Sequence, residues 1–359
     1  MKVAILSMQE VKNYGSFLQA FSLKKHIEEL GHTCEFINIV PGEQLGVYKQ
    51  SKFHKVGLLV KRLWGWDCVK RFQSIYTFQT RFKNEFLPEL GVKSSQENKY
   101  YDVIVIGSDE VFNCAQKTWF GFSPQLFGEG LNAGKVISYA GSFGATTVQV
   151  LEHLGIKERV AEMLTTNFSA ISIRDENSAE VVKTLTGKEP ILNVDPVILC
   201  DWKKYMPKAH VPLKNYMIVY TYPGRISDKE EINAIRQYAK KRGLLLVSIG
   251  HYFPWVDKTL IPHPFEVLAY FRDATCIVTD TFHGSIFSIK NEKPFCTIVR
   301  NMNSNKLTFL LKQFGLSNRI VQKLNDLELI LNSPIDYKKI NEIITVATKN
   351  GIEYLKTNL

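Results

Sequence analysis

The chain has 359 residues, of which 45% are hydrophobic and 22% charged, a composition typical of a globular protein long enough for two domains. No stretch reaches the ~18 uncharged apolar residues that a membrane-spanning helix needs. The first apolar run is too short for a signal peptide, and the six cysteines include no Cys-x-x-Cys pair. We therefore expect a cytoplasmic protein without a disulfide framework or a zinc knuckle.

The net charge of +10 is concentrated in one segment. Residues 49–84 contain nine Lys or Arg against a single acid, Asp67, so this segment carries +8 and the rest of the chain +2. Because the charge is local and no nucleic-acid-binding motif is present, we expect no nucleic-acid partner. Basic residues interleaved with Trp, Phe and Leu are typical of segments that lie on anionic membranes. The alternative is a solvated helical insertion whose aromatic residues pack on the N-terminal domain.

Strands followed by helices recur along the chain. In the first half, strands are predicted at 3–6, 33–39, 101–106, 136–139 and 170–173, with a helix over 15–30. In the second half, strands are predicted at 217–220, 244–249, 275–279 and 294–299, with helices over 228–242, 264–271, 285–290 and 337–356. This alternation predicts an α/β protein with two Rossmann-like, doubly wound domains and a cleft between them. The predicted divisions are 1–205, with the basic insertion 49–84, then 206–335, and a C-terminal helix over 336–359.

Ligands of doubly wound sheets bind at the carboxyl ends of the strands, so polar residues just past each strand are site candidates. The first group is Asn13, Gly15, Ser16 and Gln19, where a glycine and a helix N-terminus are suited to an anion. An ordinary turn between strand and helix is the alternative. The second group is Ser108, Asp109 and Asn113 after the apolar run YDVIVI, which are suited to sugar hydroxyls or to capping the next turn.

Two further groups carry charge. Arg174 ends a predicted strand, and its planar guanidinium matches a carboxylate or a phosphate, although surface pairing with Asp175 or Glu176 is the alternative. His283, with Ser285 two residues later, lies between a buried strand and a helix, where a histidine can exchange a proton near neutral pH. A structural, capping histidine is the alternative. No His-x-x-His, HExxH or Asp-x-Asp pair occurs, so no metal site is predicted.

Six motifs appear in a specific order: NYGSFLQAFSL, DVIVIGSDEVFN, SYAGSFG, SIRDENS, VDP and TDTFHGSIFSI. This ordered set resembles the polysaccharide pyruvyl transferase family from about residue 2 to 320. The resemblance implies a fold similar to that of GT-B glycosyltransferases, with the active site in the cleft between the two domains. The domain over 1–205 is then expected on the acceptor side and the domain over 206–335 on the donor side. The same resemblance implies transfer of a pyruvyl group from phosphoenolpyruvate to a sugar of a cell-surface glycan, or to its lipid-linked precursor, as a ketal. In the loop after 294–299, Lys306 stands where an arginine is common in the family.

The resemblance also implies roles for individual residues. His283 corresponds to the family's expected catalytic acid, and Arg174 to an expected anchor of phosphoenolpyruvate. Because this donor is strongly anionic, Arg300 and Lys306 are candidates for further cations. Phosphoenolpyruvate is a co-substrate, and no separate cofactor is expected. A lipid-linked acceptor would explain a basic segment at the inner face of the plasma membrane. The alternative function is that of a GT-B glycosyltransferase using a nucleotide sugar.

Overall fold

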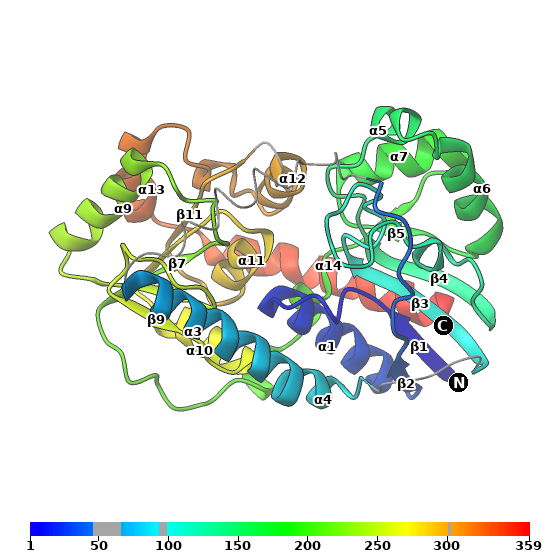
Figure 1. Ribbon diagram of the computed structural model, residues 1–359, viewed down its shortest axis with the longest axis horizontal. Coiled ribbons are helices and arrows are strands. Elements are labelled where there is room, and N and C mark those ends of the chain that lie inside the picture. Colours follow the sequence, from blue (N-terminus) through cyan, green and yellow to red (C-terminus); the bar gives the residue numbers. More distant parts are fainter. Residues whose placement is uncertain (46–65, 93–98, 301–302) are drawn as a thin grey trace. The chain divides into compact units, whose positions relative to one another are not determined.

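The computed structural model describes residues 1–45, 66–92, 99–300 and 303–359 (Figure 1). The described chain forms two compact units, each built on a parallel β-sheet. The first unit contains the described residues of 1–48, 87–200 and 341–359, and the second unit contains those of 49–86 and 201–340. The predicted α/β class with two Rossmann-like sheets is confirmed. The longer segment of the second unit begins at Asp201, close to the predicted division at 205. The location of the active site between the domains stays a prediction.

The sheet of the first unit has the order β2-β1-β3-β4-β5-β6, with every pair parallel. Its strands are β1 (Lys2–Leu6), β2 (Thr33–Phe36), β3 (Tyr101–Asp109), β4 (Ala133–Gly141), β5 (Ser172–Ile173) and β6 (Ile191–Leu192). β3 is buried along nearly its whole length because its apolar residues are covered on both faces. The strand order reverses between β1 and β3. The carboxyl ends of these two strands are therefore the place where a sheet of this kind binds ligands.

Helices cover the first sheet. α1 (Tyr14–Glu29) begins at Asn13, whose side chain accepts a hydrogen bond from the Ser16 amide and caps the helix. The other helices of this unit are α4 (Leu87–Leu90), α5 (Val148–His153), α6 (Lys157–Asn167), α7 (Glu176–Thr186) and α8 (Pro196–Leu199), with a 3₁₀ turn at Pro124–Phe127. The last helix, α14 (Tyr337–Asn358), returns to this unit, where the Tyr354 hydroxyl donates to the Ser138 carbonyl at 2.8 Å.

The sheet of the second unit has the order β11-β10-β7-β8-β9, again with every pair parallel. Its strands are β7 (Tyr216–Tyr220), β8 (Leu245–Ile249), β9 (Lys258–Leu260), β10 (Cys276–Thr279) and β11 (Phe295–Thr297). Its helices include α9 (Lys229–Lys241), α10 (Pro264–Asp273), α11 (Phe282–Lys290), α12 (Ser304–Gln313) and α13 (Leu327–Asn332), with 3₁₀ turns at Trp202–Lys204, Ser317–Arg319 and Leu324–Asp326. The order reverses between β7 and β10, so the ligand-binding edge lies where these two strands end.

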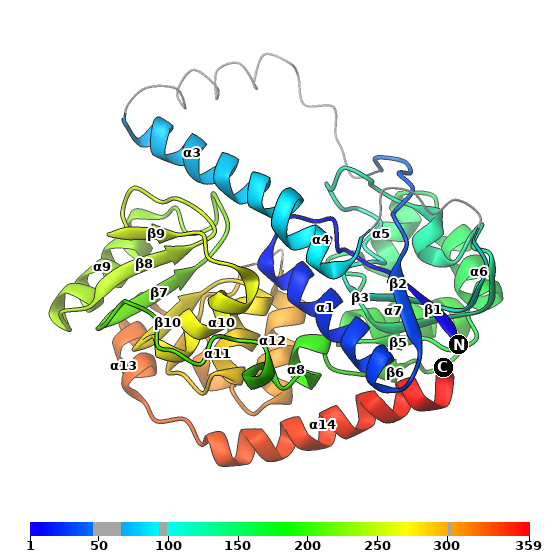
Figure 2. The same ribbon diagram turned by 90° about the horizontal axis from the view of Figure 1, so that it is seen from below.

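The described part of the basic insertion forms α3 (Trp66–Arg81) and a π-helical turn, Phe82–Phe86. This segment belongs to the second unit and lies on the β8–β9 side of its sheet (Figure 2). The ring of Phe78 lies 5.9 Å from that of His251, and the ring of Phe86 lies 5.2 Å from that of His263. This differs from the prediction, which places the insertion in the N-terminal domain. A helical pattern shows which face is apolar but not which domain buries it. Residues 49–65, with Lys61 and Arg62, lie outside the described residues.

Candidate functional site

At the carboxyl edge of the first sheet, β3 ends in the segment Gly107-Ser108-Asp109. Gly107 has a φ of 128°, and a Cβ there would overlap the Tyr139 carbonyl, so only glycine fits. Asp109 has a φ of 73°, a conformation that non-glycine residues rarely adopt. Residues in such conformations are concentrated at binding and catalytic sites. This backbone places the Asp109 carboxylate next to the switch point between β1 and β3.

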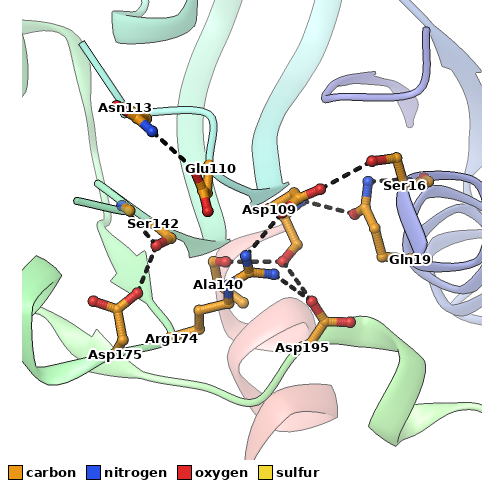
Figure 3. Close-up of polar contacts among 12 residues, drawn as sticks. Ser16, Gln19, Asp109, Glu110, Asn113, Ala140, Ser142, Arg174, Asp175 and Asp195 are labelled. Atoms are coloured by element: carbon orange, nitrogen blue, oxygen red, sulfur yellow. Dashed lines mark hydrogen bonds and ion pairs between the residues drawn. The ribbon is translucent and has the colours of Figure 1, made fainter. Parts of the chain in front are cut away.

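Arg174 follows β5 and joins two carboxylates (Figure 3). Its Nη1 lies 2.5 Å from Asp195 Oδ2, and its Nη2 lies 2.8 Å from Asp109 Oδ1. The side chains of Arg174 and Asp195 are 1% and 0% exposed, whereas that of Asp109 is 15% exposed. Burial acts to lower the pKa of Arg174, but the surrounding carboxylates, Asp109 and Asp195 foremost, raise it above its ordinary value. Arg174 is therefore a charged, buried link between two acids.

The N-terminal part of α1 holds the segment Gly107-Ser108-Asp109 in place. Ser16 Oγ donates to Asp109 Oδ2 at 3.0 Å, and Gln19 Oε1 accepts from the Ser108 amide at 3.2 Å (Figure 3). Ser108 Oγ donates to the Ala140 carbonyl at 2.9 Å. Ser16, Gln19 and Ser108 are all fully buried, and their hydrogen bonds hold this segment in place. Their contact with a substrate stays a prediction. Asn13 caps the helix, and Gly15 lies buried within its first turn.

Asn113, predicted to bind substrate, is half-buried in a neighbouring turn. Its Nδ2 donates to Glu110 Oε2 at 2.8 Å, and its Oδ1 accepts from Thr146 Oγ1 at 2.9 Å. These contacts match the capping role that the sequence had left open. Close by, Ser142 Oγ donates to Asp175 Oδ2 at 2.6 Å (Figure 3). Asp175, the expected surface partner of Arg174, is instead a buried cap at the start of α7.

His283 lies at the carboxyl edge of the second sheet, in the first turn of α11. The helix begins earlier than predicted because the Thr281 hydroxyl caps it, accepting from the Gly284 amide at 2.9 Å. Gly284 is tightly enclosed, since a Cβ there would lie 2.6 Å from Thr281 Oγ1 and 2.8 Å from the Tyr220 ring. His283 is 6% exposed. Ser285 is fully buried. Its hydroxyl contacts the Thr281 carbonyl and the Thr297 hydroxyl, so these contacts join the start of α11 to β11.

Two arginines approach the loop before α11. Arg225, which follows β7, donates from Nη1 to the Asp280 carbonyl at 3.4 Å and stacks on Tyr222 at 4.7 Å. Arg300 forms two hydrogen bonds of 2.7 Å with Glu231, and its Nε lies 3.7 Å from Asp280 Oδ2. Burial raises the pKa of Asp280, although Thr221 and both arginines oppose the shift.

The predicted site residues thus form two groups, one in each unit. Ser16, Gln19, Ser108, Asp109 and Arg174 form one hydrogen-bonded network, while His283, Ser285 and Arg300 lie at the ligand-binding edge of the second sheet. Lys306 lies half-buried on α12.

Four participants were missed as site residues. Asp195 and Asp280 were noted only as parts of the VDP and TDTFHGSIFSI motifs. Arg225 and Glu231 were not singled out, although Arg225, like Asp280, follows a strand that borders a switch point. In the described ranges, no group of three or more His, Cys, Asp or Glu side chains could hold a metal ion.

Comparison with known proteins gives one family match and several structural likenesses. Residues 13–302 match the model of a family described as polysaccharide pyruvyl transferase. UDP-GlcNAc 2-epimerase from Neisseria meningitidis, bound to UDP-GlcNAc, has a TM-score of 0.50 at 13% identity, and the match covers 100% of each chain.

The S. aureus MnaA–UDP co-structure has a TM-score of 0.51 at 12% identity, covering 100% of this chain and 98% of that one. The glycotransferase of kitacinnamycin has a TM-score of 0.50 at 9% identity, with the same coverage. These likenesses concern the fold alone. No curated protein matches the sequence significantly.

Proposed function

Because the chain belongs to the polysaccharide pyruvyl transferase family, we propose that it transfers a pyruvyl group from phosphoenolpyruvate to two hydroxyls of a sugar. The products are a cyclic ketal and phosphate. The acceptor is a sugar of a cell-surface glycan or of its lipid-linked precursor. The observation that carries the proposal is the position of His283, on the first turn of α11 beside the switch point of the second sheet.

His283 is proposed as the acid that protonates the methylene carbon of phosphoenolpyruvate. This step makes the adjacent carbon oxocarbenium-like, and a sugar hydroxyl then attacks it. Loss of phosphate and attack by a second hydroxyl complete the ketal. Of the two hydroxyl protons, one replaces the proton that His283 gives to the methyl group, and the other leaves with phosphate. A positioned acid of this kind contributes about 10²–10⁴ in rate.

The N-terminus of α11 and the two nearby arginines support binding of an anionic donor in the second unit. Helix N-termini stabilise anions, and guanidinium groups match carboxylate and phosphate oxygens. Arg225 and Arg300 both approach the loop that precedes His283. Lys306 is retained as a candidate cation on α12. The reaction changes no oxidation state, so we propose phosphoenolpyruvate as co-substrate and no separate cofactor.

The exposed face of α3 supports a peripheral contact with an anionic membrane at the cytoplasmic side. Val69, Phe72 and Tyr76 are 63%, 71% and 63% exposed, and the rings of Phe72 and Tyr76 stack at 6.4 Å. Lys70, Arg71 and Lys83 add positive charge along the same segment. A lipid-linked acceptor would give this contact a purpose. In the described part of the chain, no helix is both long and apolar enough to cross a membrane.

The proposal is tested by phosphate release from phosphoenolpyruvate across a panel of sugars, with NMR detection of the ketal methyl group in the product. A parallel arm replaces phosphoenolpyruvate by nucleotide sugars. Phosphate release that depends on a sugar, together with a ketal methyl signal, is expected. Glycosyl transfer from a nucleotide sugar, with no reaction of phosphoenolpyruvate, would establish the alternative function instead.

A further inference from the structure

We propose that Asp109 binds the acceptor sugar and takes the proton of the attacking hydroxyl, and that Arg174 positions Asp109. This inference rests on the proposed function and assigns the acceptor to the first unit. It gives Arg174 a role different from the donor anchor that the family resemblance implies. Three features carry it: the burial of Arg174, the sign of the surrounding charge and the place of Asp109 in the sheet.

The burial of Arg174 separates it from solvent. Its side chain is 1% exposed, and its two terminal nitrogens donate to Asp195 and Asp109. To reach a phosphate or a carboxylate, the guanidinium would have to give up these contacts, and breaking a buried ion pair is strongly unfavourable. Asp109 is the member of this trio with appreciable exposure, at 15%. A ligand at this edge therefore meets the carboxylate and not the guanidinium.

The charge around Arg174 is acidic. Asp109, Asp195, Asp175 and Glu110 all act on it electrostatically, so four acids surround one cation. Phosphoenolpyruvate and nucleotide sugars are anions, so the carboxylates around Arg174 repel them. A neutral sugar escapes this repulsion, because its hydroxyls donate hydrogen bonds to carboxylates. The electrostatics thus favour the acceptor over either donor at this edge.

The place of Asp109 is fixed from both sides. Its Oδ1 accepts from Arg174 Nη2 at 2.8 Å and its Oδ2 from Ser16 Oγ at 3.0 Å. Both contacts orient the carboxylate, and the one to Arg174 is charge-assisted and therefore strong. The carboxylate also lies beside the β1–β3 switch point, where sheets of this topology bind ligands.

The proposed step is balanced. As the hydroxyl oxygen of the sugar forms a bond to the oxocarbenium-like carbon, its O–H bond breaks and the proton passes to an Asp109 oxygen. Attack on such an electron-poor carbon acidifies the hydroxyl, so a carboxylate is a sufficient base. Asp109 then returns the proton to solvent or to the departing phosphate.

The experiment compares Asp109→Asn, Arg174→Lys and the control Asp102→Asn. Asp102 is on the same strand, at its other end, and accepts from the Lys2 amide. Turnover is measured while acceptor and phosphoenolpyruvate are varied separately, and binding of each sugar of the panel is measured by calorimetry. Asp109→Asn should lower kcat/KM for the acceptor by about 10²–10⁴ while leaving the KM for phosphoenolpyruvate unchanged. Arg174→Lys should raise the acceptor KM, and Asp102→Asn should match wild type.

The inference is overturned if Asp109→Asn keeps wild-type acceptor kinetics, or if Arg174→Lys raises only the KM for phosphoenolpyruvate. A wild type that binds a sugar but does not react with phosphoenolpyruvate contradicts the proposed function alone. In that case, weaker sugar binding by Asp109→Asn still supports the acceptor site, and equal binding overturns it. A wild type that neither binds a sugar nor turns over contradicts both.

Discussion

Arg174 Nη1 lies 2.5 Å from Asp195 Oδ2, and both side chains are buried. The two residues come from different loops of the first unit, one after β5 and the other before α8. Asp195 also caps α8, because its Oδ1 accepts from the Val197 amide at 3.0 Å. One carboxylate therefore neutralises a buried cation and starts a helix.

Asp195→Asn should destabilise the protein by about 3–5 kcal/mol, because it keeps the cap acceptor but removes the charge that compensates Arg174. Urea unfolding measures the change. Asp201→Asn is the control, since Asp201 is an exposed cap a few residues later and asparagine caps as well as aspartate. The control should stay within about 0.5 kcal/mol of wild type. Equal stability of the two variants would show that the pair contributes nothing.

The Thr281 hydroxyl should control the helix turn that holds His283. Thr281→Val keeps the shape but removes the acceptor for the Gly284 amide, so it should cost about 1 kcal/mol and reduce turnover. Thr281→Ser keeps the hydroxyl and should retain both stability and rate. Thermal unfolding measures the stability of the two variants, and steady-state assays measure their turnover. Identical behaviour of the two variants would mean that the cap does not position His283.

Much of the fold could be predicted from apolar runs, and most of the site contacts could not. The runs YDVIVI and TCIVT are long and apolar enough to identify β3 and β10 as buried strands. β6 was missed because Ile191 and Leu192 are an isolated, exposed pair without an apolar run. α11 was predicted to start late because Gly284 is a weak helix former, whereas the Thr281 cap sets the start.

The candidate site also depends on contacts that sequence patterns do not reveal. The residues after each strand could be predicted to gather at one edge, and Asp109 and Arg174 do so. That Asp195 pairs with Arg174 depends on tertiary structure, because 21 residues separate them and no periodicity connects them. Without that partner, Arg174 looks like an exposed anchor. With it, Arg174 is a buried link.

His251 should make stability depend on pH. Burial lowers its pKa to about 4, while the unfolded chain has the ordinary value of about 6.5. Between these values the unfolded state binds a proton that the folded state does not. The unfolding free energy should therefore fall as the pH drops from about 6.5 to about 4, by roughly 2–3 kcal/mol from this residue.

His251→Gln should weaken that pH dependence, which urea unfolding at several pH values would measure. The matched control is His153→Gln, a change of an exposed histidine on α5, and it should follow the wild-type curve. An unchanged slope in His251→Gln would contradict the assignment.

The exposed face of α3 should bind anionic vesicles. Phe72 and Tyr76 are exposed and stacked, and basic residues lie beside them. In sedimentation with vesicles that contain phosphatidylglycerol, wild type should pellet at low salt and less at high salt. The double variant Phe72→Ser, Tyr76→Ser should stay in the supernatant, whereas Tyr100→Ser, an exposed tyrosine of the first unit, should pellet like wild type. Wild type remaining in the supernatant at low salt would contradict the membrane contact.

The central claim is that His283 protonates the methylene carbon of phosphoenolpyruvate, and turnover in D₂O tests it most directly. The ketal methyl group should then carry one deuteron, visible by mass spectrometry and NMR. His283→Ala should form this product about 10²–10⁴-fold more slowly. His210→Ala, which changes a histidine 87% exposed in the same unit, should react like wild type. A sugar product without a deuterated methyl group, or full activity in His283→Ala, would contradict the account.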